Sequence, residues 1–439
     1  MNILQTTPNL NYRKNLGFTL MEVLIAMAIG VVVLVGALSY FGTGVRSMQT
    51  ADAYARMHEN ASRAASIIGR DVQLAGFYGF GGSARAQNIM SEDGNLFSSG
   101  GSFIPPYSET VHYADATASV CGARYLLPLQ NDNRALPIEY YEDSTEFQAA
   151  LTAALPSNAS PVDVANCVPN IINNSPILVV RGALEGVMIN DSINILGTEL
   201  PTVGLLSNRR LYITAIPTAN IDARNVFFFF GRGSAETAVA NFETFTWPRA
   251  WSDGLIQQKA SGDYFPVFQY QFRVYYLRNF FDTPGDNIPT LVRRQLIDGN
   301  AEFTVRTVVE RMVSGVEAMN FLWGIDDRGS FRVNSDVAIG DGITDWWSEA
   351  LPANQFGNVN ALRMQVLMRS PTADGSYNDR NITYNFDGVI GSRGQFNCAD
   401  IEADFPPSCR HRRLLYETST SARNCTLRRR AGLLNTGGC

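Results

Sequence analysis

The sequence is poor in lysine, in histidine and in closely spaced cysteines, and each shortage argues against a class of function. Lys14 and Lys259 are the only lysines, and the formal net charge of −6 argues against the strongly basic face that general nucleic-acid binding needs. Three histidines and the lack of any C-x-x-C pair argue against a zinc site of the usual spacing. The motifs G-x-S-x-G and G-x-x-x-x-G-K-S/T are also absent. We therefore expect neither an enzyme nor a cofactor, and nucleic acid is not a favoured partner.

The sequence does contain a large apolar fraction and an even number of cysteines. Hydrophobic residues make up 45% of the 439 residues, which is enough for a sizeable core. Scattered cysteines in even number indicate disulfides in an exported chain, although the sequence does not select a pairing. Four of the six lie beyond residue 397, which favours a stapled C-terminal loop. The disulfide candidates are Cys121, Cys167, Cys398, Cys409, Cys425 and Cys439.

The N-terminus carries a membrane-spanning pattern with one unusual acid. A basic stretch ending at Arg13 and Lys14 precedes an apolar run from Phe18 to Val45, in which Glu22 is the single charge. The uncharged part of this run is long enough to cross a hydrocarbon core of about 30 Å as a helix. The positive-inside rule then leaves the N-terminus cytoplasmic and the remainder periplasmic. A cleaved secretory signal would have a shorter apolar core, and a plain anchor would not explain Glu22, whose insertion costs about 2.5–3.5 kcal/mol.

The segment Gly17-Phe18-Thr19-Leu20-Met21-Glu22, after its short basic leader, resembles the class III signal of type IV prepilins. The resemblance implies that a prepilin peptidase cuts between Gly17 and Phe18 and that Phe18 is then N-methylated. It also implies that Glu22 pairs with the N-terminal amine of a neighbouring subunit. Because a buried ion without its partner is costly, such a pair would select correct stacking in a filament.

Beyond residue 45 the pattern becomes amphipathic, which indicates that the same helix leaves the membrane and packs one face on a head domain. We expect it to end near Ala75-Gly76, where glycine can form a cap. The alternative is a pair of helices broken near Gly42-Thr43-Gly44. Val45, Met48, Ala55, Ile67, Val72 and Leu74 form the expected apolar face, and Arg46, Asp52, Arg56, Glu59, Arg63, Arg70 and Asp71 the charged one. The expected divisions are a leader (1–17), a transmembrane half-helix (18–45), an amphipathic half-helix (46–76) and a β-rich head (77–439).

Alternating apolar residues predict several strands, and no βαβ alternation is present. The expected fold class is α+β: a long N-terminal α-helix packed on an antiparallel β-sheet head with large loop insertions. Residues 80–170 are rich in glycine, serine, asparagine and proline, which is typical of loops with short elements. The predicted strands are Pro176–Val180, Leu211–Ile216, Val226–Phe230, Phe265–Leu277, Leu291–Leu296, Val313–Leu322 and Ala361–Arg369.

Several of these segments, in order along the chain, resemble the body of PilW-type minor pilins. They are Arg70–Gly79, Arg273–Arg278, Leu291–Arg294, Val313–Asp326 and Val359–Ser370. The resemblance implies a minor pilin that primes pilus assembly at or near the tip, with roles in adhesion and twitching motility. Its implied partners are the other minor pilins, the major pilin and a tip adhesin. The alternatives are a J-type minor pseudopilin of type II secretion and a DNA-uptake pilin.

Two charged stretches of the sequence are candidate binding sites. Oxygen-rich loops suit calcium, but Arg328 and Arg332 interrupt the acidic stretch, so a solvated turn is the favoured interpretation. Its weak calcium candidates are Asp326, Asp327, Asp341 and Asp345. The C-terminal arginines could contact DNA, but a solvated or salt-bridged tail is favoured. These are Arg410, Arg412, Arg413, Arg423, Arg428, Arg429 and Arg430.

Overall fold

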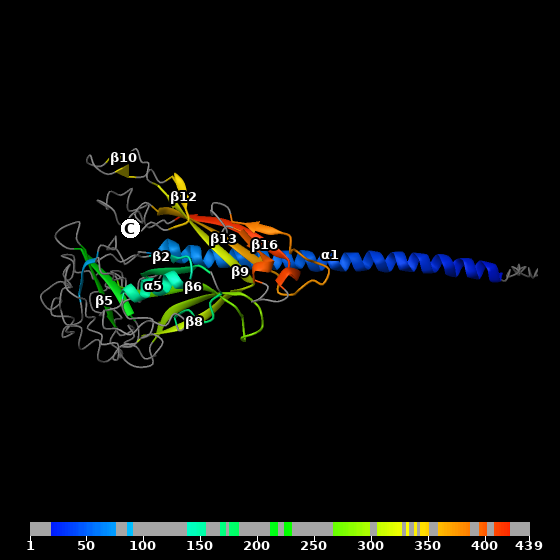
Figure 1. Cartoon of the computed structure of the whole chain (residues 1–439), viewed down its shortest axis with the longest axis horizontal. Coiled ribbons are helices and arrows are strands. Elements are labelled where there is room, and N and C mark those ends of the chain that lie inside the picture. Colours follow the sequence, from blue (N-terminus) through cyan, green and yellow to red (C-terminus); the bar gives the residue numbers. More distant parts are fainter. Residues whose placement is uncertain are drawn as a thin grey trace, which may run out of the picture. The chain divides into compact units, whose positions relative to one another are not determined.

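The computed structural model describes most of the N-terminal helix and the framework of the head. The described residues are 19–75, 86–90, 138–154, 167–172, 175–183, 211–217, 224–230, 267–298, 305–326, 331–332, 338–339, 343–350, 359–386, 395–401 and 408–421. The chain divides into two compact units, Met1–Ala55 and Arg56–Cys439. Helix α1 (Leu20–Leu74) is continuous across this division, so the alternative of two helices broken near Gly42 is wrong (Figure 1).

The larger sheet of the second unit has eight strands in the order β1-β5-β4-β6-β3-β2, with β7 pairing with β6 and β8 with β7. All of its pairs are antiparallel except β1 with β5, which is parallel. Its strands are β1 (Ala86–Met90), β2 (Ile138–Tyr141), β3 (Ile177–Ala183), β4 (Leu211–Pro217), β5 (Arg224–Phe230), β6 (Val267–Arg278), β7 (Thr290–Asp298) and β8 (Val305–Ser314).

The smaller sheet is antiparallel throughout, in the order β12-β9-β13-β16. Its strands are β12 (Trp346–Ser348), β9 (Val316–Ile325), β13 (Val359–Arg369) and β16 (Arg413–Ser421). Two strand pairs complete the sheets, β10 (Phe331–Arg332) with β11 (Ala338–Ile339), and β14 (Thr383–Asn385) with β15 (Gln395–Asn397). The other helices among the described residues are α5 (Ser144–Ala154), η6 (Cys398–Ile401) and η7 (Ser408–Arg410).

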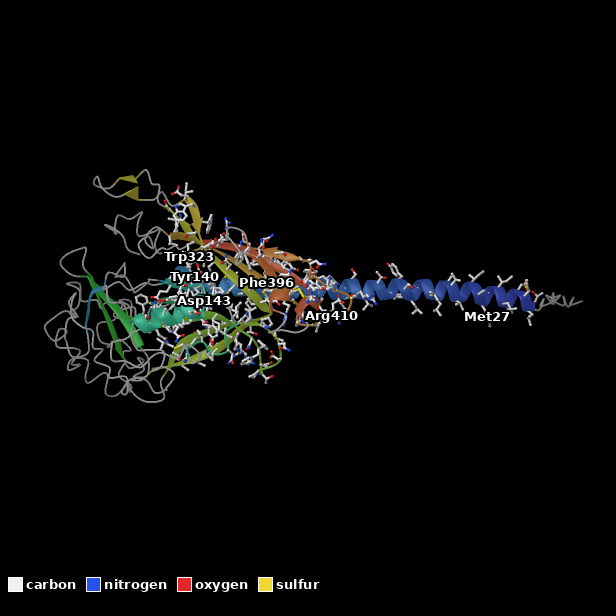
Figure 2. All side chains as sticks on the ribbon, viewed as in Figure 1. Met27, Tyr140, Asp143, Trp323, Phe396 and Arg410 are labelled. Carbon is white, nitrogen blue, oxygen red and sulfur yellow. A yellow bond between two sulfur atoms is a disulfide. The ribbon has the colours of Figure 1, made fainter. Side chains whose placement is uncertain are left out.

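The C-terminal part of α1 forms the centre of the core. Its buried residues recur every three or four positions, so they lie on one face of the helix. This face packs in one cluster with side chains of both sheets, among them Tyr275 of β6 and Trp323 of β9, each 0% exposed. Tyr140 of β2 stands edge-on to Trp323, with ring centroids 6.1 Å apart (Figure 2). The helix residues in the cluster are Met57, Ala61, Ala64, Ala65, Ile68 and Val72.

The expected α+β class, the single long helix and its end near residue 75 are confirmed. Two details were wrong. The run Val313–Leu322 is not one strand, because Gly315 adopts φ 82° and turns β8 into β9. Asp71 was placed on the charged face, yet it is only 5% exposed and faces the sheet.

Candidate assembly site

The first candidate site is the exposed apolar part of α1. Within the described residues, α1 is the one helix whose length and composition would allow it to cross a membrane. Large apolar side chains cover it without burial: Val32 is 72% exposed and Met27 64%, and Figure 2 shows Met27 projecting from the helix. A surface of this kind is unfavourable in water, so it requires lipid or neighbouring helices around it.

The start of α1 is a capping box built from Thr19 and Glu22. The backbone N–H of Thr19 donates to Glu22 Oε2 at 2.9 Å, its hydroxyl donates to the same oxygen at 3.0 Å, and the Glu22 N–H donates to Thr19 Oγ1 at 3.3 Å. This reciprocal pattern satisfies N–H groups that a helix start leaves unpaired. Sequence reasoning gave Glu22 a role in assembly but missed the T-x-x-E capping signal. Gly17 and Phe18 lie outside the described residues.

The second site is an ion cluster around the buried Asp71, where α1 ends, and we call it the helix-exit cluster. Its members are Asp71, Arg273, Tyr275, Arg293 and Glu310. Arg273 Nη1 and the Tyr275 hydroxyl donate to the two carboxylate oxygens of Asp71, and Arg293 Nη1 lies 3.9 Å from Oδ2. Arg293 Nη2 also donates to Glu310 at 2.8 Å, so the cluster joins α1 to β6, β7 and β8. Burial, and then the negative charge of Asp71, raise the pKa of the Tyr275 hydroxyl, which therefore stays a donor.

A close backbone contact fixes the same end of the helix. Ala75 forms an antiparallel bridge with Gly182 of β3. A Cβ at position 182 would lie 2.6 Å from the Leu74 carbonyl oxygen, so this approach requires glycine. The end of α1 is thus held by an ion cluster and by direct backbone contact.

The third site is a buried cluster next to a disulfide, which we call the Arg413 cluster. Its members are Glu317, Arg369, Asp379, His411 and Arg413. Arg413 donates to both oxygens of Glu317 at 2.5 and 2.9 Å, and its Nη1 donates to Asp379 Oδ2 at 2.6 Å. The side chains of Glu317, Asp379 and Arg413 are 0% exposed. Burial, and then the positive charge of Arg369, lower the pKa of His411 to about 4, and its Nδ1 lies 2.7 Å from the Ser370 carbonyl oxygen.

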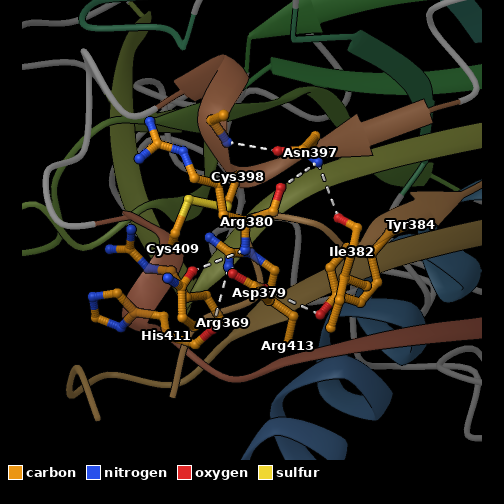
Figure 3. The surroundings of a disulfide bond; sticks show 12 residues. Arg369, Asp379, Arg380, Ile382, Tyr384, Asn397, Cys398, Cys409, His411 and Arg413 are labelled. Carbon is orange, nitrogen blue, oxygen red and sulfur yellow. Dashed lines mark hydrogen bonds and ion pairs between the residues drawn. A yellow bond between two sulfur atoms is a disulfide. The ribbon is translucent and has the colours of Figure 1, made fainter. Parts of the chain in front are cut away.

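The structure describes some of the candidate disulfide cysteines and some of the C-terminal arginines. Cys398 and Cys409 form a disulfide that covers the Arg413 cluster, as Figure 3 shows, and Cys167 is also disulfide-bonded. The stapled C-terminal loop is therefore confirmed for this pair. Arg412 binds Asp374 at 2.8 Å, which with Arg413 fits the salt-bridged interpretation of these arginines. Cys121, Cys425, Cys439, Arg423 and Arg428–Arg430 lie outside the described residues.

Two of the calcium candidates lie side by side in the described structure. The Asp345 N–H donates to the Ile325 carbonyl oxygen at 2.8 Å, and the antiparallel register Trp346↔Ile325 places Asp345 opposite Asp326. Asp326 is 1% exposed, whereas Asp345 is exposed. Asp327 and Asp341 lie outside the described residues, so calcium binding stays a prediction. Close to Asp345 in the sequence, Trp347 is half-buried, and the guanidinium carbon of Arg363 lies 4.2 Å from the centroid of its ring.

Two models of known protein families match the chain, one at its N-terminus and one in its head. A model of the prokaryotic N-terminal methylation motif matches residues 12–38, so the chain has the N-terminus of a prepilin. A model of the type IV pilus assembly protein W matches residues 274–424, from β6 to beyond β16. Together the two matches support a PilW-type minor pilin, which confirms the family expected from the sequence. They indicate a structural pilus component, anchored in a membrane before assembly, that interacts with other pilins. No curated protein and no solved structure matches the chain.

Proposed function

We propose that this minor pilin primes type IV pilus assembly and is incorporated at or near the tip of the pilus, where it supports adhesion and twitching motility. One observation carries the proposal. An exposed, uncharged helical surface from Val23 to Val45 begins beside a single acid, Glu22, at the point where prepilins are cut. A plain membrane anchor has no use for an acid in this position.

In the proposed mechanism, the apolar helices of adjacent subunits pack side by side, and an ion pair between Glu22 and a neighbour's N-terminal amine sets their alignment. Cleavage after Gly17 would free the amine of Phe18, and the apolar faces of α1 from adjacent subunits would pack side by side. In the described residues, Thr19 occupies Glu22 Oε2 and no hydrogen bond reaches Oε1, so Oε1 can receive the amine of a neighbour. Because an unpaired ion in this surrounding is costly, misaligned subunits would be rejected.

This function implies a sequence of locations and partners. We propose that residues 1–17 are removed by a prepilin peptidase, that residues 18–45 hold the chain in the inner membrane, and that residues 46–76 leave the membrane. The head, residues 77–439, would lie in the periplasm before assembly and at the cell surface afterwards. Its partners would be other minor pilins, the major pilin and a tip adhesin, and its role would be structural and not enzymatic.

The first test is the mature N-terminus. Mass spectrometry of the chain from pili sheared off the cell surface should find N-methylated Phe18 as the first residue. An uncut Met1, or a cut elsewhere, would refute the processing step.

The second test separates the charge of Glu22 from its capping role. Glu22→Gln keeps the acceptor oxygen that a capping box needs but removes the charge, whereas Glu22→Ala removes both. We expect both variants to insert into the membrane normally, yet to reach the sheared fraction about tenfold less, because the incoming amine loses its counter-ion. Glu59→Gln, an exposed acid further along α1, is the control. Normal incorporation of Glu22→Gln would show that the pairing role is wrong.

A further inference from the structure

Strand β16 is a long and regular sheet edge. It pairs with β13 over all nine residues without a bulge, and with no other strand among the described residues. Proteins usually protect such edges with charges, proline or bulges. From Glu417 onward the only charge is Glu417 itself, and the neighbouring strand holds it through Gln365 at 2.7 Å and Arg363 at 3.6 Å. The C-terminal half of β16, from Glu417 onward, therefore lacks the features that usually keep an edge strand from pairing with another chain.

The register shows which backbone groups of β16 face outward. Ser370 N–H donates to the Arg412 carbonyl at 2.9 Å, so this pair is hydrogen-bonded across the sheet. Hydrogen-bonded and non-hydrogen-bonded pairs alternate along an antiparallel ladder. In the register Met364↔Thr418 and Leu362↔Thr420, Thr418 and Thr420 therefore turn their backbone groups toward β13. Glu417, Ser419 and Ser421 turn theirs toward the open edge, and the side chains of all three are exposed.

An open groove of about 270 Å³ runs between this edge and α1. On the helix side Ser66, Arg70 and Gln73 recur at the spacing of one helical face, and on the sheet side Thr418 and Thr420 contribute hydroxyls. Gln73 Nε2 donates to Thr420 Oγ1 at 2.7 Å, which ties the two walls together. Arg70 is exposed and is the one charged residue among those that line the groove.

We propose that β16 is a docking edge for an extended segment of another pilus subunit, which adds to the smaller sheet as a further strand. A strand in this place would satisfy the outward backbone groups, and alternate side chains would point to the α1 side of the sheet and enter the groove. The groove is lined largely by hydroxyl and amide groups, so the segment should place small hydroxyl or amide side chains in it. The proposal rests on the proposed pilus function, because it takes the partner to be a subunit of the same filament.

The test removes an outward hydrogen-bond donor without touching the ladder. Proline is tolerated on an edge strand where its missing N–H would face solvent, so Ser419→Pro removes only the donor that the partner would use. Ser419→Ala keeps this N–H and is the matched control. A photo-crosslinking residue at Ser421 of the full chain, in cells that make the pilus, reports on the partner. We expect an adduct with a strand of another prepilin-type subunit, retained in Ser419→Ala and reduced about tenfold in Ser419→Pro.

Further measurements make the result decisive. Non-reducing peptide mapping should find the Cys398–Cys409 disulfide in every variant. Should Ser419→Pro misfold, Ser421→Pro is a second edge variant, with the photo-crosslinking residue then placed at Ser419. An adduct unaffected by Ser419→Pro, one formed with residues 422–439 of the same chain or with lipid, or no adduct at all would overturn the docking edge. Methylated Phe18 in sheared pili would still support the proposed function in that case, so the two failures are distinguishable.

Discussion

At the scale of single residues, ion clusters join elements of the head that are far apart in the sequence. Asp71 contacts Arg273 and Tyr275 on β6 and lies near Arg293 on β7. Each of these charges alone would be costly to bury, and together with Glu310, which pairs with Arg293, they neutralise one another. The cluster therefore fixes where the helix ends against the larger sheet, in a way that apolar packing alone would not.

Removing this carboxylate should strongly destabilise the head. Asp71→Asn leaves Arg273 and Arg293 near a neutral group, and breaking a buried ion pair from one side typically costs about 3–5 kcal/mol. We expect the free energy of unfolding in urea, measured on the full chain in detergent, to fall by an amount of this order. Glu59→Gln on the exposed side of α1 should change it by no more than about 0.5 kcal/mol. Equal stability of the Asp71 variant and the wild type would mean that the cluster contributes no net stability.

His411 should make stability depend on pH. Burial and the nearby Arg369 and Arg413 lower its pKa to about 4 in the folded chain, against an ordinary value of 6.5. Between these values the unfolded chain binds more protons, so the contribution is complete above about pH 6.5 and is lost as the pH falls toward 4. In the His411→Gln variant, the urea midpoint of unfolding should fall less between about pH 6.5 and pH 4 than it does in the wild type. An identical pH profile in the variant would show that His411 does not titrate there.

The role of these residues was not evident from the sequence for a physical reason. Asp71 follows Arg70 in an alternation of charges that also describes a solvated helix face, and only the position of β6 and β7 shows that it is buried. Arg413 lies in an arginine-rich tail, yet its partners Glu317 and Asp379 are far away along the chain. Contacts between residues so distant in sequence leave no local pattern to read.

At the scale of elements, glycine marks the place where sequence periodicity was misread. Residues on both sides of Gly315 are rich in apolar and β-branched types, and the run Val313–Leu322 was therefore predicted as one strand. Gly315 interrupts it with φ 82°, its N–H donates to the Pro289 carbonyl at 2.7 Å, and its carbonyl accepts from Arg369 N at 2.7 Å. An isolated glycine within a strand pattern was the available signal for this turn.

Replacing this glycine should disturb the β8–β9 connection. Gly315→Ala would place a Cβ 2.7 Å from the Arg369 carbonyl oxygen and hold alanine at a positive φ, which costs at least about 1–2 kcal/mol. The unfolding midpoint in urea should fall accordingly. Gly375→Ala is the matched control, because a Cβ there meets no atom within 4 Å. Comparable midpoints for the two variants would contradict the strained turn.

Elements with strong local signals were predicted well, and those defined by distant partners were not. Strand β6 alternates over twelve residues and α1 has a continuous helical pattern, so both were expected close to their observed bounds. Strand β16 was missed because its polar sequence ThrSerThrSer lacks an apolar alternation and is a strand only through pairing with β13. Of the candidate site, the position of Glu22 and the cysteine-stapled loop could be anticipated, whereas the two ion clusters could not.

At the scale of the whole molecule, the division into two units predicts that assembly and head folding fail separately. The Cys398–Cys409 disulfide, with a sequence separation of 11, lies wholly within the second unit and covers the Arg413 cluster. Cys398→Ser with Cys409→Ser should lower the stability of that unit by about 2–4 kcal/mol and make it more sensitive to protease. The first unit holds the apolar start of α1 with its capping box, so resistance of the chain to alkaline extraction from membranes, and the mature N-terminus at Phe18, should stay unchanged. Glu22→Gln should give the converse, with a protease-resistant head that enters the filament poorly. Loss of membrane retention in the cysteine variant would contradict this independence, since it would mean that the N-terminal helix needs a folded head to hold its place.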